Sequence, residues 1–252
     1  MRLKEYIDRL LSHQDSVIAT LGRKLDDYFR NFDLSRNPSV NPQTQLNSLI
    51  EAQSLIQKEK QLIKAANRQL PKQSKIPVNK LNAAFLEEYA LNLLSFLIWN
   101  SLNYNSLVIT LDAEIPLWEG YTWKNGCPVH ETAVWRPDIA IGRYFEDQER
   151  SVLNKGHREF FQKAEWDGVF IPLVVVSCKY RVSAAEFYDT HARFEILRNT
   201  SPFTLAVELA NKCLIANAHT ARRRIYFLEL GNEMVGSFIE DVQEHLDRYM
   251  KL

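Results

Sequence analysis

Residues 172–181 read PLVVVSCKYR, a run of apolar β-forming residues that ends in a lysine. A short, continuous apolar run of this kind predicts a strand that is buried on both faces of a sheet. We expect the strand to span residues 169–180. Lysine is rarely buried without a partner, so Lys179 at the end of this strand needs an explanation.

A second polar residue stands at the end of another predicted strand. Residues 133–144 read AVWRPDIAIGRY, which predicts a strand bent at Pro137 and carrying Asp138. Because strands that follow one another in sequence are usually neighbours in the sheet, Asp138 and Lys179 are expected to lie side by side. A carboxylate can hold a hard cation, and a lysine can neutralise charge or orient a water. Together they suit phosphodiester hydrolysis assisted by Mg²⁺.

The remaining patterns predict an α/β fold with a mixed central β-sheet flanked by helices. In residues 77–252, helices are expected over 79–99 and 184–198 and from residue 235, and further strands over 106–112, 203–210 and 223–230. Residues 1–76 are expected to form a helical arm for DNA contact or dimerisation. Its apolar spacing predicts one long amphipathic helix over 2–32 and a second over 44–69.

Composition restricts the class of protein. The chain has 252 residues, 46% of them hydrophobic, which is typical of a globular protein with a large core. Its 31 basic and 31 acidic residues exclude a general nucleic-acid coating protein, which would be basic. We expect no membrane span, no signal peptide and a reducing cytoplasm, since the N-terminus is charged and the three cysteines show no metal spacing.

Basic residues are nevertheless concentrated in one segment. Residues 58–80 hold seven lysines and arginines, Lys64 and Arg68 among them, against the single acidic residue Glu59. The segment is either a solvated helix face or an arm that contacts phosphates.

The pair of motifs resembles the PD-(D/E)XK nuclease superfamily. The residues that carry the likeness are Pro137, Asp138, Ser177, Cys178 and Lys179. Within the superfamily the chain is most similar to type II restriction endonucleases of the BbvCI kind, through FLEEYALNLL, WRPDIAIG, IPLVVVSCKYRV, ARFEILRNTSPFTLAVELA and RIYFLEL. The likeness covers roughly residues 80–230. It implies Mg²⁺ as cofactor, and it implies the backbone carbonyl of Cys178 as a further metal ligand.

One position departs from the superfamily pattern. An acid is expected two residues before the lysine, and here that residue is Ser177. Strand alternation puts residues 177 and 179 on the same side, so Ser177 occupies the place of the acid. The resemblance implies that the acid can come instead from the following helix. Glu195 is the candidate there, with Glu186 as runner-up.

A further carboxylate is expected from the predicted helix over 79–99. Glu87 shares an apolar stripe with Leu91 and Leu94, where a carboxylate is costly unless it has a partner. The resemblance implies that a glutamate of this helix reaches the active site. We prefer Glu87, with Glu88 close behind.

DNA contacts are expected from residues around the predicted site and in the arm. Arg181 and Arg193 flank the site and can bind phosphates or guanine edges, while Lys64 and Arg68 lie in the basic segment. Residues 117–135, rich in tryptophan, either pack as a buried loop or help to read DNA.

The resulting hypothesis is a Mg²⁺-dependent, sequence-specific endonuclease that cuts double-stranded DNA in a restriction–modification system. It would act as a homodimer or as one subunit of a heterodimer with a related chain. Two alternatives stay open at this stage. One is a repair or recombination nuclease that nicks DNA, and the other is an inactive DNA-binding or scaffold protein that lost its acid at Ser177.

Overall fold

The structure is a computed structural model that describes residues 2–32, 42–71, 75–111, 113–144, 170–213, 225–228 and 232–250. The contacts divide the chain into two compact units. The first unit contains Met1–Phe96 and Cys178–Tyr180, and the second contains Leu97–Ser177 and Arg181–Leu252. This division follows packing, and the functional boundary at residue 76 stays a prediction.

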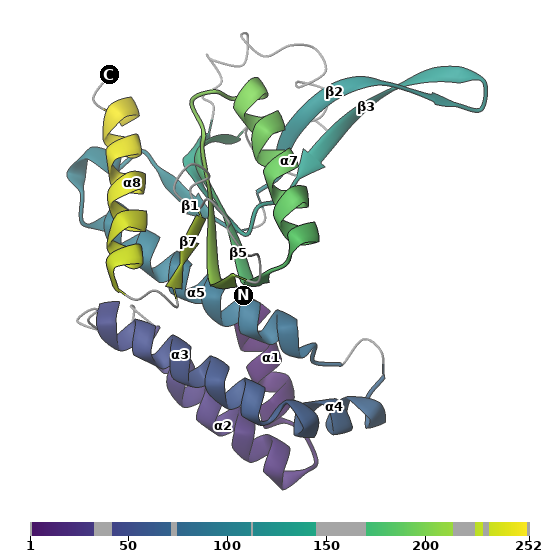
Figure 1. Cartoon of the computed structure of the whole chain (residues 1–252), viewed down its shortest axis with the longest axis vertical. Helices are drawn as coiled ribbons and strands as arrows, with labels where there is room; N and C mark the ends of the chain where they lie inside the picture. The colour runs from purple at the N-terminus through teal and green to yellow at the C-terminus, as the bar shows by residue number, and fades with distance from the viewer. Residues whose placement is uncertain are drawn as a thin grey trace. The chain divides into compact units, whose positions relative to one another are not determined.

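The first unit is built from helices (Figure 1). They are α1 (Arg2–Leu11), α2 (Ser16–Arg30), α3 (Pro42–Lys58), α4 (Lys60–Gln69) and α5 (Val78–Trp99). The prediction of one helix over residues 2–32 is wrong, because Asp15 caps a new helix by accepting a hydrogen bond from Val17 N at 2.8 Å. The predicted helix over 44–69 is likewise two helices, since the helical hydrogen bonding is interrupted at Glu59.

Close packing holds these helices together. A Cβ added at Gly22 of α2 would lie 2.8 Å from Leu11 N, so only glycine lets α2 approach the end of α1 this closely. Phe32 packs edge-on against Phe85 and Tyr89 of α5, with ring centroids 6.2 and 6.4 Å apart. The apolar stripes that predict the helices therefore form the buried core of this unit.

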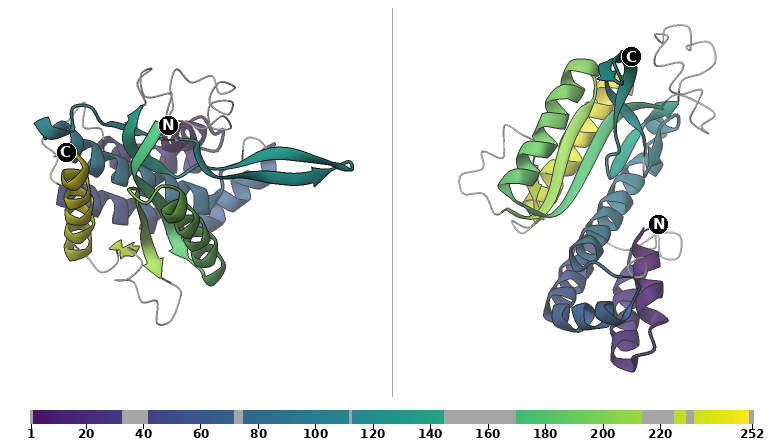
Figure 2. Two further views of the ribbon diagram at one scale, coloured as in Figure 1. Left: turned by 90° about the horizontal axis from the view of Figure 1, so that it is seen from above. Right: turned by 90° about the vertical axis from the view of Figure 1, so that its right-hand side faces the viewer.

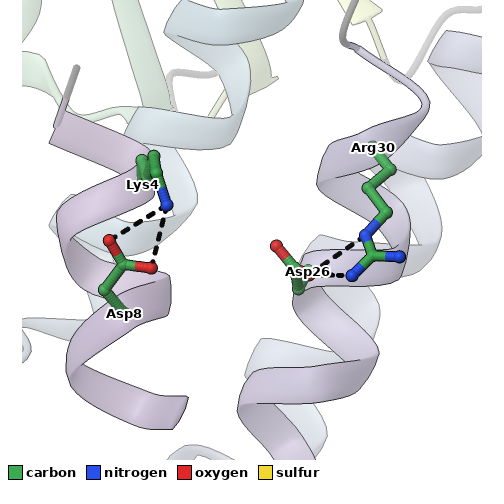
Figure 3. Close-up of polar contacts among 4 residues, drawn as sticks. All are labelled: Lys4, Asp8, Asp26 and Arg30. Atoms are coloured by element: carbon green, nitrogen blue, oxygen red, sulfur yellow. Dashed lines mark hydrogen bonds and ion pairs between the residues drawn. The ribbon is translucent and has the colours of Figure 1, made fainter. Parts of the chain in front are cut away.

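Two ion pairs lie on the surface of the first two helices (Figure 3). Lys4 pairs with Asp8 at 3.1 Å, and Arg30 pairs with Asp26 at 2.8 Å. These pairs are largely exposed to water and contribute little to stability. Their consequence is local neutralisation of the surface of α1 and α2.

The second unit contains a five-stranded sheet. Its strands are β1 (Val108–Thr110), β4 (Ile139–Tyr144), β5 (Phe170–Val182), β6 (Leu205–Cys213) and β7 (Ile225–Phe227), in that order across the sheet. The pairs β1–β4 and β4–β5 are antiparallel, and β6–β7 is parallel. The predicted mixed sheet is thus confirmed, and the strands predicted over 106–112, 169–180, 203–210 and 223–230 are present with shifted ends.

Two helices complete this unit, α7 (Ala184–Thr200) and α8 (Asn232–Met250), as predicted. Phe194 and Leu197 of α7 pack in one apolar cluster with Ala140 and Val175 of the sheet. The short helix η2 (Leu102–Tyr104) contacts α8 through Tyr104, whose hydroxyl donates a hydrogen bond to Asp247 at 2.7 Å.

A β-hairpin replaces two of the predicted features. The strands β2 (Ile115–Lys124) and β3 (Cys127–Trp135) form a separate two-stranded sheet. The tip residues Asn125 and Gly126 have φ of 51° and 80°, as a two-residue type I′ turn requires. Figure 2 shows the hairpin as a long ribbon that projects away from the central sheet. The single bent strand predicted over 133–144 is therefore wrong, because Pro137 separates β3 from β4, and residues 117–135 form a hairpin and not a loop.

Among the described residues, α5 is the helix long and apolar enough to cross a membrane by length and composition. Of its most apolar window, 72% is buried inside the structure, and a core helix meets the same criterion. The expectation of no membrane span stays a prediction.

Candidate active site

The register of two strands brings Asp138 beside Ser177. Ile139 of β4 pairs with Val176 of β5 in antiparallel register, so Asp138, the residue before β4, comes near Ser177, the residue after Val176. Because the strands are antiparallel, the start of β4 lies beside the end of β5. The prediction that these sequential strands are neighbours is confirmed. Lys179 lies two residues beyond Ser177 on the same strand.

Ser177 and Lys179 lie on the face of the sheet that α7 covers. Ala140 and Val175 are paired across β4 and β5, and both pack against Phe194 of α7. Alternation along β5 places Ser177 and Lys179 on this same face, and Asp138 immediately precedes β4.

Exposure differs along the site. Asp138 and Lys179 are half-buried, whereas Ser177 and Cys178 are each 3% exposed. Within the described part of the chain, the side chain of Lys179 makes no hydrogen bond or ion pair. The alternating pattern turns the Cys178 side chain to the opposite face, so its thiol packs and only its backbone carbonyl stays a candidate ligand. Asp138 offers hard oxygen donors of the type that Mg²⁺ prefers.

The predicted acids of α7 take part in surface interactions of their own helix. Glu195 is exposed and pairs with Arg198 at 3.0 Å. Glu186 forms a capping box with Ser183, whose backbone N–H donates to its carboxylate at 3.0 Å. The buried face of the helix consists of Phe187, Thr190, Phe194 and Leu197. Neither acid belongs to that face, and their role in the site stays a prediction.

On α5, Glu88 is more buried than Glu87, although the helical wheel places Glu87 on the apolar stripe. Glu88 is 7% exposed and Glu87 is half-buried. The helical wheel separates an apolar stripe from a polar one, but 72% of the most apolar window of α5 is buried, so the wheel does not rank the two glutamates by burial. Both residues belong to the first unit, and their part in the active site stays a prediction.

Sequence reasoning missed one carboxylate. Glu208 of β6 is 0% exposed, and β6 lies next to β5 in the sheet. The signal was present in the run LAVELA, where a charged residue interrupts an apolar strand. Within the described ranges, no three His, Cys, Asp or Glu side chains gather as metal ligands.

Candidate DNA contacts lie in both units. Lys60, Lys64 and Arg68 follow one another at four-residue intervals on α4, so they share one stripe of that helix, and α4 contains no acidic residue. Lys64 and Arg68 are exposed, and neither pairs with another described residue. Arg181 is exposed at the end of β5, whereas Arg193 pairs with Asp189 at 2.8 Å.

Comparison with known proteins identifies the fold. No family model matches the chain, and no curated protein matches its sequence. Among solved structures, a chain of the native BbvCI A2B2 tetramer aligns with a TM-score of 0.51. The fold is that of restriction endonucleases. The alignment covers 92% of this chain and 88% of that chain, at 10% sequence identity. At this identity the likeness establishes the restriction-endonuclease-like fold alone, and the predicted fold class is confirmed.

Proposed function

We propose that this protein is a Mg²⁺-dependent endonuclease that hydrolyses phosphodiester bonds in double-stranded DNA. The observation that carries the proposal is the register of β4 and β5, which pairs Ile139 with Val176 and so brings the preceding Asp138 near Ser177, two residues before Lys179. A carboxylate and a lysine at the adjoining ends of neighbouring strands provide a metal ligand and a cation for the phosphate.

The residues divide the chemistry between them. Asp138 holds the metal, with Glu195 or Glu87 as the candidate second carboxylate and the carbonyl of Cys178 as a further ligand. The bound Mg²⁺ supplies a Lewis acid for the phosphoryl and leaving oxygens. The ammonium group of Lys179 orients the attacking water and offsets the charge that develops on the phosphate.

The finer assignment is a type II restriction enzyme that acts in the cytoplasm. Its support is the likeness to the BbvCI chain, which belongs to an A2B2 tetramer. We infer that this chain recognises a defined DNA sequence as a homodimer, or as one subunit paired with a related chain. Arg181 and Arg193, near the active-site strand, are candidates for contacts to phosphates or bases.

Digestion of a long DNA of known sequence tests the proposal. Purified protein with Mg²⁺ should produce discrete fragments whose ends share one sequence, and EDTA should abolish them because the metal is removed. Nicks in one strand would indicate half of a two-subunit enzyme. Cleavage confined to mismatches or junctions would support a repair nuclease, and DNA binding without any cleavage would support an inactive binding protein.

The basic stripe of α4 is expected to contact the DNA backbone. Lys64→Gln combined with Arg68→Gln should weaken DNA binding several-fold and lower the slope of log K against log salt by about 2, because each phosphate contact releases roughly one counterion. Fluorescence anisotropy across a salt series measures both quantities.

A matched control uses two cations that their own helices neutralise. Lys4→Gln combined with Arg30→Gln removes the same charge from α1 and α2, where Asp8 and Asp26 pair with these residues. Its salt slope should stay close to that of the original chain. Equal effects of the two double variants would show that net charge, and not the α4 stripe, determines binding.

A further inference from the structure

Glu208 is a fully buried carboxylate inside the central sheet. It lies on β6 between apolar neighbours, and its exposed fraction is 0%. A carboxylate in an apolar interior is costly unless hydrogen bonds, a cation or a metal compensate for the lost hydration. Its position relative to Asp138 follows from the contacts of β6.

The face of the sheet on which Glu208 lies follows from its neighbours two residues away. Ala206 packs against the apolar cluster that contains Val175 and Phe194. Ala210 belongs to a cluster that contains Phe187 of α7. Since residues i and i+2 of a strand share a face, Glu208 lies on the α7 face, together with Ser177.

The level of Glu208 along the sheet follows from contacts near both ends of β6. The hydroxyl of Thr204 donates to the carbonyl of Pro172 at 2.7 Å, so β6 begins beside the beginning of β5. Ala210 shares an apolar cluster with Val182 and Phe187, which lie at and after the other end of β5. The two strands therefore run parallel. Glu208 falls between these points, at the level of the β5 segment that contains Ser177.

The spacing of the strands fits a metal between Asp138 and Glu208. The strands β4 and β6 flank β5, so their backbones lie about 9.6 Å apart at the ordinary strand spacing. The lengths of an aspartate and a glutamate side chain, together with two metal–oxygen bonds of about 2.1 Å, are enough to span this distance. Ser177 on the intervening strand is small, and an acidic side chain there would occupy the same space.

We propose that Glu208 is the second carboxylate ligand of the metal that Asp138 holds, and that it takes over the role of the acid missing at Ser177. This inference rests on the proposed function. One or two carboxylates completed by substrate phosphate and water form a usual Mg²⁺ site in nucleic-acid enzymes. Glu208 is then the fully buried ligand, and Asp138 is the half-buried one.

Binding of Mn²⁺, followed by the electron paramagnetic resonance signal of the free ion, tests the assignment without measuring activity. Glu208→Gln keeps the size of the side chain and removes its charge, so Mn²⁺ affinity should fall at least about tenfold, as should that of Asp138→Asn. Glu240→Gln removes an exposed carboxylate of α8, away from the proposed site, and is the control that should bind Mn²⁺ like the original chain. Loss of binding in Glu195→Gln and not in Glu208→Gln would overturn the inference.

A change at Ser177 separates metal binding from a purely structural role. Ser177→Asp places a carboxylate between Asp138 and Glu208, so Mn²⁺ should bind more tightly in the original background and should bind again in the Glu208→Gln background. A structural Glu208 predicts a lower melting temperature in Glu208→Gln, with Mn²⁺ affinity unchanged and no recovery by Ser177→Asp. The single Ser177→Asp variant keeps the test decisive even where Glu208→Gln does not fold, because unchanged Mn²⁺ affinity in it contradicts the inference.

The inference and the proposed function fail in different ways. A chain that cuts DNA with Mg²⁺ and binds Mn²⁺ equally well after Glu208→Gln keeps its function and loses this inference. A folded chain that neither binds Mn²⁺ nor cuts DNA loses both.

Discussion

Lys179→Ala should lower the rate of Mg²⁺-dependent DNA cleavage by about a hundredfold to ten-thousandfold, the range typical of a group that acts on the water or the developing charge. Lys179 is half-buried and its side chain makes no hydrogen bond or ion pair with a described residue, so its removal should leave folding nearly unchanged. Single-turnover cleavage of a labelled duplex measures the rate, and the melting temperature reports folding.

Lys212→Ala provides the control for Lys179→Ala. Lys212 is an exposed lysine near the end of β6, the strand next to β5, so its loss removes the same charge from the same sheet. Its cleavage rate should stay within a few-fold of the original. Should Lys179→Ala cut as fast as Lys212→Ala, Lys179 has no role in the reaction and the proposed chemistry is wrong.

Gly142→Ala should be the most destabilising single methyl addition in the central sheet. A Cβ at this position of β4 would lie inside van der Waals contact with the carbonyl oxygen of Ile171 and 2.9 Å from Cζ of Phe170. The register of β4 and β5 shifts between Ile141 and Gly142, so the backbones approach closely at this bulge. Because backbone must move, we expect a loss of about 3 kcal/mol, or roughly 6–12 °C in melting temperature.

Gly236→Ala tests the same substitution without a clash. Gly236 lies within α8, and a Cβ there meets nothing within 4 Å. Alanine favours a helix by up to about 1 kcal/mol over glycine, so the melting temperature should rise slightly. A melting temperature for Gly142→Ala equal to that of Gly236→Ala would show that the close approach of β4 to β5 does not occur in solution.

The active-site strands could be predicted from sequence because their signals are local. The β-branched run before Ser177 predicts β5, and the order of the strands predicts that β4 lies beside it. The sequence therefore predicts that Asp138 and Lys179 lie close together.

Helix breaks and the hairpin could not be predicted in the same way. The apolar spacing continues through Asp15 and Glu59, so periodicity joins helices that the backbone separates. Pro137 reads as a bend within one strand, and only strand pairing shows that Trp135 and Ile139 belong to different sheets. The Asn125–Gly126 pair is typical of a two-residue hairpin turn, but the tryptophan-rich segment around it is interpreted as a loop.

The sequence by itself determined the α/β class, the buried strand that carries Ser177 and Lys179, and the neighbouring Asp138, because each depends on residue type and on short spacing along the chain. Only the tertiary structure decided that Glu208 shares the face of the sheet that carries Ser177 and that Glu195 points to water. Those facts depend on which strand lies beside β5 and on which face of α7 is buried. Both result from packing between segments that are distant in sequence, and no local pattern specifies them.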